Sequence, residues 1–445
     1  MSHLVRRIIF WSFLFLFIVL TIYFSLLASG YSILLSSSGG SYKFGFLQKT
    51  GILAVDSTPH EAEIELSKNF KSFLSSKEIL KNKKIKTPYK VKNLIPGEYS
   101  LKVELDGYWP FEKKIYINPG QTTYIEDIIL LKKTLPVMIF SSSVQNIKIN
   151  NDSTHVIFTE SGKLFNVDNE SEIYLGDDVK NLSFIDNYYL SIDNKKIFNY
   201  KEKNSLVLSK NDVGSIYNLK TNNGNLYFLN DKGFLSSYSF GLQNFSTVLS
   251  ESGVVDYYLS GSYVFVVLKT DVSTYLKVYS ISDSKIVKSI EIPSYGDYKI
   301  IPSNNNLLFV YEEKFSSLYL IDPFSQISQI REVLKNVHDV NFIDNNSFVY
   351  YSDFELRIFN TSLMQDALIS RFQNKIKSLL WHPKGYIIFS DGQSINAIDF
   401  RYDKYIVNLF TFDKISNLVL DKNGGSLYFT GKIANQEGLY KLFIQ

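Results

Sequence analysis

The sequence contains no cysteine among its 445 residues, which excludes disulfides, thiolate zinc sites, iron–sulfur ligation and cysteine catalysis. Histidine is scarce as well, and no two histidines have the spacing of a metal-binding motif. The five are His3, His60, His155, His338 and His382. We interpret His382, which precedes a proline, as an ordinary turn residue.

Motifs for catalysis and for nucleotide binding are missing too. The sequence has no glycine-rich phosphate loop, no dinucleotide fingerprint, no Gly-x-Ser-x-Gly elbow and no aspartate-rich calcium loop. Its net charge is only +3, which gives no reason to expect a dedicated nucleic-acid binder. We therefore predict no catalytic, metal or cofactor-binding residues, no enzymatic activity and no nucleic-acid partner.

Aromatic residues are abundant, with 31 Tyr and 34 Phe against 3 Trp. Tyr and Phe suit the pleated, half-buried surface of a sheet. The hydrophobic share of 45% and the charged share of 20% are typical of a globular protein. The composition therefore predicts a folded, mainly β protein.

A long apolar run lies close to the N-terminus. Arg6 and Arg7 precede a stretch from Ile8 to Leu27 that carries no charge and is long enough to cross a hydrocarbon core of about 30 Å. The alternative is a signal peptide with a cleavage site at 28–30, but signal-peptide apolar regions run only about 7–15 residues. We predict a transmembrane helix, with the arginines on the cytoplasmic side and the rest of the chain exported. Because there is no cysteine, a lipoprotein anchor is excluded.

Residues 51–133 read as short strands in which apolar and polar residues alternate. Two Pro-Gly turns interrupt them, at 96–97 and 119–120. The region resembles the PEGA domain, a small β-sandwich of prokaryotic surface and membrane proteins. The residues that carry this resemblance are Ser57, Pro59, Ala62, Thr87-Pro88, Pro96-Gly97-Glu98-Tyr99, Gly107-Tyr108 and Leu130. The resemblance implies a sandwich fold and an accessory role, and no activity.

The region departs from the family in two places. The name-giving tetrapeptide reads Pro59-His60-Glu61-Ala62, so that Glu61 replaces the family's glycine and the first turn is expected to differ. The segment Ser67–Lys86 is longer than the usual connection and rich in lysine. Its basic residues could contact anionic lipid or a cell-wall polyanion, or they could form a solvated loop, which we favour.

The remaining residues, 134–445, repeat one strand motif at intervals of about 40 residues, the spacing of four-stranded propeller blades. The eight copies begin at Leu164, Ile197, Leu235, Leu276, Leu318, Leu356, Ile395 and Leu439. A continuous apolar run precedes each copy, as expected of middle strands that are buried on both faces. The stretch 381–389 resembles the strand–turn–strand unit of WD40-like and TolB-like propellers, without the Gly-His and Trp-Asp dipeptides of true WD40 repeats. We predict a β-propeller of eight blades, with seven as the alternative.

The last repeat ends at Gln445, directly after its third strand. A closed propeller needs an outer strand for that blade, and the apolar segment Leu135–Phe140 could supply it. Such a pairing would also remove two exposed sheet edges. We therefore predict that this segment closes the ring.

Five aspartates near the first strands of the repeats could converge at the central channel, where a glycosidase would need two carboxylates about 5–10 Å apart. They are Asp186, Asp256, Asp297, Asp339 and Asp344. Aspartate is also common in turns for reasons of backbone geometry, which is the interpretation we favour. Exposed tyrosines could form a platform for glycans, although Tyr is also the favoured packing residue here. Trp109 is interpreted as structural.

Taken together, these patterns predict a single-pass membrane protein whose domains lie outside the cytoplasm. The leading hypothesis is a binding or scaffold protein of the cell envelope, with an envelope protein or a cell-wall polymer as its partner, and with ligand-binding residues unknown. A glycan hydrolase or lyase and a ligand sensor are the alternatives. The predicted parts are 1–7 (cytoplasmic), 8–28 (transmembrane), 29–50 (linker, with a flexible serine- and glycine-rich segment at 36–41), 51–133 (PEGA-like sandwich) and 134–445 (propeller).

Overall fold

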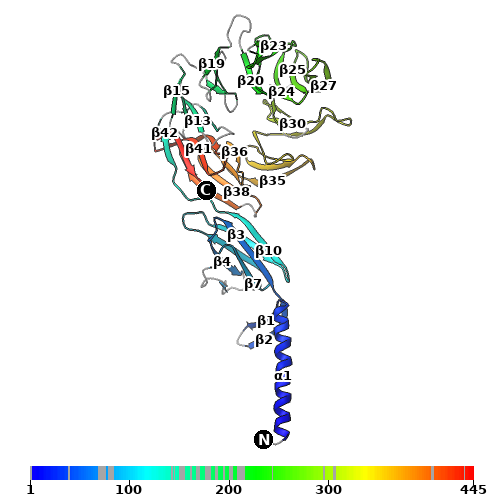
Figure 1. Cartoon of the computed structure of the whole chain (residues 1–445), viewed down its shortest axis with the longest axis vertical. Coiled ribbons are helices and arrows are strands. Elements are labelled where there is room, and N and C mark those ends of the chain that lie inside the picture. The colour runs from blue at the N-terminus through cyan, green and yellow to red at the C-terminus, as the bar shows by residue number, and fades with distance from the viewer. Residues whose placement is uncertain are drawn as a thin grey trace. The chain divides into compact units, whose positions relative to one another are not determined.

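The chain forms two compact units in the computed structural model: residues 1–134 together with Gln445, and Leu135–Ile444. Both units are mainly β, as predicted (Figure 1). The structure describes residues 3–445 except for 39–40, 69–76, 79–84, 142–143, 145, 150–155, 161–162, 167–170, 176–181, 186–188, 194–195, 200–203, 208–215, 243, 294–295, 304–306, 402–404 and 435.

The apolar run near the N-terminus is helix α1 (His3–Ala28). From Arg6 to Leu26 it is long and apolar enough to cross a membrane, and no other helix in the described residues meets that test. Its large apolar side chains, among them Phe10 and Phe13, are exposed. An exposed apolar helix at this position fits a membrane anchor or a signal sequence.

The predicted linker at residues 29–50, in which residues 36–41 are flexible by composition, contains two strands. Strands β1 (Tyr31–Ser38) and β2 (Ser41–Lys49) pair antiparallel there, with Tyr31 opposite Lys49. The reason lies in the sequence of β2, where aromatic residues at 42, 44 and 46 alternate with Lys43 and Gly45. That period of two is the pattern of a strand, and the serine-rich composition of the neighbouring residues hid it.

Residues 51–133 form two sheets, as predicted for a sandwich. One has the order β10-β3-β7, with β10 parallel to β3, and the other has the order β5-β4-β8-β9, with β6 also paired to β4. The alternating residues of β8, Tyr99, Leu101 and Val103, are buried as expected. The strands are β3 (Gly51–Thr58), β4 (Glu63–Lys68), β5 (Lys77–Glu78), β6 (Ile85–Lys86), β7 (Tyr89–Leu94), β8 (Gly97–Glu104), β9 (Phe111–Ile117) and β10 (Thr122–Ile129).

Two hydroxyls of the PEGA-like motif meet inside the sandwich. The side chains of Ser57 and Thr87 are buried and lie 2.7 Å apart, and Thr87 Oγ1 also accepts the backbone N–H of Ala62 at 3.1 Å. Ser57 Oγ donates to the carbonyl of Pro59 at 2.7 Å. These bonds fix the turn that carries Glu61, whose φ is 68°. The backbone therefore keeps the left-handed conformation that suits the family's glycine, although Glu61 replaces it.

The second unit contains, in its described residues, eight antiparallel sheets of four strands. Each of seven sheets takes its strands in sequence order. They are β12 (Asn146–Ile149), β13 (Val156–Glu160), β14 (Lys163–Asn166) and β15 (Ser171–Tyr174); β16 (Leu182–Phe184), β17 (Tyr189–Ile192), β18 (Lys196–Asn199) and β19 (Asn204–Val207); β20 (Ile216–Asn222), β21 (Asn225–Asn230), β22 (Leu235–Ser239) and β23 (Asn244–Leu249); β24 (Val254–Ser260), β25 (Tyr263–Lys269), β26 (Thr274–Ser280) and β27 (Ile286–Ile292); β28 (Tyr298–Ile301), β29 (Leu308–Glu312), β30 (Ser317–Ile321) and β31 (Ile330–Leu334); β32 (Asp339–Phe342), β33 (Ser347–Tyr351), β34 (Glu355–Asn360) and β35 (Gln365–Arg371); and β36 (Ser378–Trp381), β37 (Ile387–Ser390), β38 (Ser394–Asp399) and β39 (Tyr405–Thr411).

The eighth sheet joins the two ends of the unit. Its order is β11-β42-β41-β40, in which β11 (Val137–Phe140) precedes the first repeat and the others, β40 (Lys414–Leu420), β41 (Ser426–Ile433) and β42 (Gln436–Phe443), form the last. Val137 lies opposite Lys441 and Met138 opposite Tyr440. The predicted closing strand is thus confirmed, while the total of eight blades in a closed ring stays a prediction.

Neighbouring sheets pack through their inner strands and their buried middle strands. Among the inner strands, β24 lies beside β28, β32 beside β36, and β40 beside both β36 and β12. The second strands, such as β37 and β33, are continuously apolar and almost wholly buried, as the sequence predicted. In Figure 1 the red C-terminal sheet accordingly lies beside the first repeat.

His382 is a buried contact between the last two sheets. It is fully buried, its Nε2 donates to the carbonyl of Gly424 at 2.8 Å, and its Nδ1 accepts the backbone N–H of Lys384 at 3.1 Å. Burial lowers its pKa, so that the neutral ring persists. The histidine thus occupies a turn, as interpreted, and also bridges two sheets. This contact leaves no room for a side chain at position 424, because a Cβ added to Gly424 would lie 2.3 Å from His382 Nε2.

Replacement of Glu61 by glycine is expected to stabilise the first unit by about 1 kcal/mol, since glycine adopts the left-handed conformation without the steric cost of a Cβ. Thermal unfolding of the detergent-solubilised chain measures the change. The control is Glu126→Gly, the same substitution at an exposed position of strand β10, which should lower the stability by about 0.5–1 kcal/mol. A lower melting temperature for Glu61→Gly would contradict the assignment of the turn.

Replacement of Gly424 by alanine is expected to cost about 3 kcal/mol, because the new methyl group must displace His382 and break its hydrogen bond. Gly224→Ala is the matched control. Gly224 has nearly the same φ, +71° against +74°, but a Cβ there meets nothing within 4 Å. The control should therefore cost only about 1 kcal/mol. Equal losses in the two variants would show that His382 does not hold the two sheets together.

Candidate functional site

Asp256, one of the aspartates predicted to face the central channel, instead connects three sheets through hydrogen bonds. It is 4% exposed on the inner strand β24. Its Oδ1 accepts Asn218 Nδ2 and Lys220 Nζ from β20, both at 2.5 Å, and its Oδ2 accepts the backbone N–H of Ile300 in β28 at 2.6 Å. A bulge in β20, at which Asn218 has a φ of 50°, brings the two donors onto the carboxylate.

The other predicted carboxylates have partners of their own. Asp297 forms an ion pair with Lys269 at 3.2 Å. Asp344 accepts the backbone N–H of Asn346 and so closes the turn in which it lies. Asp339 accepts the backbone N–H of Val340. Desolvation of its carboxyl group by the surrounding protein raises the pKa of Asp339, although the residue is exposed at the surface. Asp186 lies outside the described residues, and no hydrogen bond or ion pair found in the structure joins any two of the other four to a shared group.

The remaining candidates from the sequence form no metal centre. His60 contacts Asp56 and His338 contacts Asp353, each at 3.0 Å. Within the described part of the chain, no three histidine or carboxylate side chains are placed to hold a metal ion. His155 and most of the lysine-rich segment, including Lys71, Lys81, Lys83 and Lys84, lie outside it.

Trp109 is partly buried in the first unit. The Lys133 ammonium lies 4.9 Å from the centroid of the Trp109 ring, and the buried indole N–H of Trp109 has no hydrogen-bond partner among the described residues. A ring that is packed in this way and covered by a cation of its own unit fits the structural interpretation.

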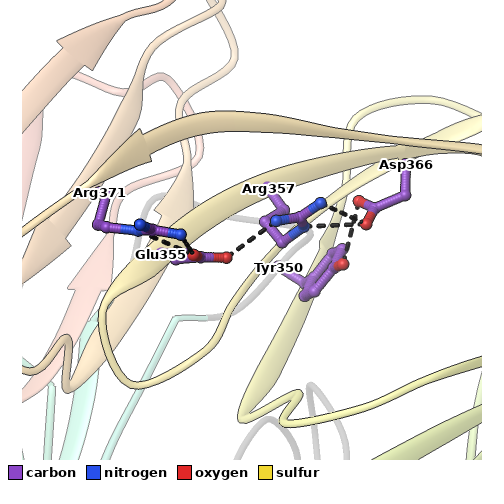
Figure 2. A network of polar contacts seen from close by, with 5 residues as sticks. All are labelled: Tyr350, Glu355, Arg357, Asp366 and Arg371. Carbon is purple, nitrogen blue, oxygen red and sulfur yellow. Dashed lines mark hydrogen bonds and ion pairs between the residues drawn. The ribbon is translucent and has the colours of Figure 1, made fainter.

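A polar network covers one face of the sheet β32–β35 (Figure 2). Arg357 lies at its centre, donating through Nε to Asp366 at 2.9 Å and through Nη1 to Glu355 at 2.8 Å. Tyr350 also donates to Asp366, at 3.0 Å, and Arg371 forms an ion pair with Glu355. The two arginines lower the pKa of Glu355. Since each carboxylate is matched by an arginine, the network ties strands β33, β34 and β35 together.

A cleft opens between the sheets β24–β27 and β28–β31, with a volume of about 420 Å³. This size lies within the range of small-molecule sites. We call it the aromatic cleft, and its lining residues are Tyr258, Ser260, Tyr263, Phe265, Ser303, Leu307, Leu308, Asp322, Pro323 and Phe324.

The rings of the aromatic cleft come from both of its walls. Tyr258, Tyr263 and Phe265 belong to one sheet, and Tyr263 lies 5.2 Å from Phe324 of the other, centroid to centroid, at 49°. Tyr258 and Phe265 stack at 6.3 Å and 27°. Tyr258 and Tyr263 rest on the buried core that both sheets share, so their positions are set by the packing of strands β24 and β25.

Asp322 holds the turn that carries Phe324, on the far wall of the aromatic cleft, through hydrogen bonds to the backbone. Asp322 Oδ1 accepts the N–H of Phe324 at 3.1 Å, and the Asp322 N–H donates to the carbonyl of Gln329 at 2.8 Å. Phe324 is thereby fixed with 44% of its surface exposed. No lysine, arginine or histidine occurs among the residues that line the aromatic cleft, so Asp322 is its one charged side chain.

The sequence analysis did not single out the residues of the aromatic cleft. Tyr258 and Tyr263 read as ordinary strand residues, and Phe324 follows a proline in a connection between strands. In the sequence, tyrosines that could form an exposed platform for glycans cannot be told apart from tyrosines that pack in the core. Only the repeat spacing offered a signal, because it placed these three positions at one end of two adjacent blades.

The family comparison agrees with the first unit. Residues 76–129 match the model of the PEGA domain. The chain contains a PEGA domain. The match begins after strands β3 and β4, which complete the sheets of the same sandwich. A search of curated proteins finds no relative of this chain.

Solved structures resemble the second unit in fold. The computationally designed Ika8 protein matches with a TM-score of 0.50 at 14% identity, over 68% of this chain and 97% of its own. The Dos1 propeller has a TM-score of 0.49 at 13% identity, over 71% and 96%, and BamB from Moraxella catarrhalis one of 0.45 at 10% identity, over 70% and 100%. At these identities the likeness concerns the fold alone, which is a β-propeller.

The hydrogen bonds of Asp256 predict a structural loss. Asp256→Asn is expected to lower the free energy of unfolding by about 3 kcal/mol. The substitution replaces one acceptor oxygen of the carboxylate by an NH2 group, and it leaves the Lys220 ammonium without a negatively charged partner. The control Asp297→Asn removes an exposed ion pair and should cost less than about 1 kcal/mol. Urea unfolding of the second unit in the full chain measures both. Asp256→Asn with unchanged stability would return Asp256 to the candidates for a channel site.

Proposed function

We propose that this chain is a membrane-anchored binding or scaffold protein of the cell envelope, whose domains lie outside the cytoplasm. Helix α1 is the anchor, the PEGA domain is an accessory spacer, and the propeller carries the binding surface. Its partner is an envelope protein or a cell-wall polymer. Propeller folds host many functions, so the proposal rests on the sites of this chain and not on the fold.

The aromatic cleft is the observation that carries the binding role. Its rings are held by the core and by the Asp322 turn, yet they remain accessible at the surface. Preformed clefts with aromatic walls and a few polar groups are typical of ligand sites. By contrast, Asp256 and the network around Arg357 are occupied by partners within the chain, which supports a structural role for them over catalysis.

The charge pattern at the N-terminus supports the orientation. Arg6 and Arg7 precede the apolar part of α1, and positive residues favour the cytoplasmic side. The length of the apolar part of α1, from Arg6 to Leu26, supports an uncleaved anchor, because the apolar regions of signal peptides run only about 7–15 residues.

The full chain with a C-terminal tag is expected to sediment with membranes, to resist alkaline carbonate and to be released by detergent. In spheroplasts, added protease should digest the tag. Arg6→Glu combined with Arg7→Glu should reduce the exported fraction, because it removes the positive charge that orients the helix. The matched control is Lys113→Glu combined with Lys114→Glu in strand β9, which should leave the orientation unchanged.

Two results would contradict the proposal. Release by carbonate would show that α1 is no anchor, as would a mass that lacks the first residues. A tag that is protected in intact spheroplasts and digested after lysis would place the propeller in the cytoplasm.

A further inference from the structure

We propose that the ligand of the aromatic cleft is a neutral glycan chain, whose pyranose rings stack on Tyr258, Tyr263 and Phe324. This inference rests on the proposed binding function and names the chemical class of its ligand.

The walls of the aromatic cleft offer faces for stacking. Tyr263 and Phe324 are only 5.2 Å apart, and Tyr258 stacks on Phe265 further along the same wall. A pyranose ring presents one face of C–H bonds, which pack against an aromatic face and bury apolar area there. Several rings along one wall therefore suit a ligand made of successive flat units.

The polar groups of the aromatic cleft suit hydroxyls. Tyr258 and Tyr263 line the aromatic cleft, and a tyrosine hydroxyl can both donate and accept a hydrogen bond. Asp322 uses Oδ1 for the N–H of Phe324, which leaves Oδ2 as an acceptor. Ser260 is exposed at the rim. This set of donors and acceptors complements a polyhydroxylated ligand.

The charge of the lining residues favours a neutral ligand over an acidic one. The lining residues include a carboxylate and no cation, so that phosphate, sulfate and carboxylate groups would be repelled or left unpaired. An anionic polymer, an acidic peptide or an anionic lipid headgroup therefore fits poorly. A neutral glycan needs no cation and leaves no charge buried.

The test is calorimetric titration of the detergent-solubilised full chain with chitohexaose, cellohexaose and maltohexaose, together with a heparin-derived hexasaccharide as the charged probe. We expect saturable binding of at least one neutral probe and at least tenfold weaker binding of the charged one. Tyr263→Ala and Phe324→Ala should each weaken binding of that neutral probe at least tenfold. Tyr263→Phe, which keeps the ring, should weaken it only a few-fold.

The control variant is Tyr217→Ala, which removes an exposed tyrosine from strand β20, outside the aromatic cleft, and should leave binding unchanged. The inference is overturned if no neutral probe binds, or if Tyr263→Ala and Phe324→Ala bind like the parent. Where the alanine variants fail to fold, Tyr263→Phe and Tyr258→Phe provide a second test. If both phenylalanine variants fold and bind the neutral probe with the affinity of the parent, the tyrosine hydroxyls are not part of the binding site.

A photo-crosslinking residue in place of Phe324, introduced in living cells, separates the two proposals. Crosslinks to one defined envelope protein, without binding of any glycan probe, would overturn the glycan inference and leave the binding function in place. Failure of both experiments would overturn both.

Discussion

The second unit depends on the pairing of β11 with β42, because a four-stranded sheet that ends with its third strand leaves an open edge. Val137, Met138 and Phe140 of β11 supply that edge with hydrogen-bonding partners, and the two ends of the unit are joined noncovalently. Phe140 also packs against Phe165 of the first repeat, with ring centroids 5.0 Å apart. The pairing of β11 with β42 and the contact of Phe140 with Phe165 therefore hold the first and last repeats together.

Between the sheets, a few buried polar groups connect neighbouring strands through hydrogen bonds. Asp256 joins β20, β24 and β28, and His382 joins the last two sheets through Gly424. The Arg357 network does the same within one sheet. These groups have the residue types of catalytic sites, but their hydrogen bonds end on backbone and side chains of the same unit. A buried carboxylate whose two oxygens are hydrogen-bonded in this way contributes to the stability of the fold.

The aromatic cleft follows from the same packing. Two neighbouring sheets share a core around Val267, Val310 and Ile321, and the aromatic cleft lies between the same two sheets. The aromatic residues at the end of the core then have one face on protein and one face toward the opening. A loop that is fastened by Asp322 keeps Phe324 opposite Tyr263. Such a site is preformed, so a ligand pays little to order it.

How much could be predicted differs between the levels of structure. Local patterns predicted the helix, the sandwich strands around Tyr99, the repeated sheets and the closing strand, because periodicity and turn residues act over a few neighbouring positions. The hairpin at 31–49 was missed, since its serine-rich flank outweighed a real alternation in β2. The sequence could also place Asp256 on an inner strand, but not its partners Lys220 and Ile300, which lie about 40 residues away on either side. By itself, then, the sequence determined the order and type of the elements. Only the tertiary structure decided that Asp256 and His382 connect neighbouring sheets and that Tyr258, Tyr263 and Phe324 share one cleft, because such contacts depend on how separate sheets are packed.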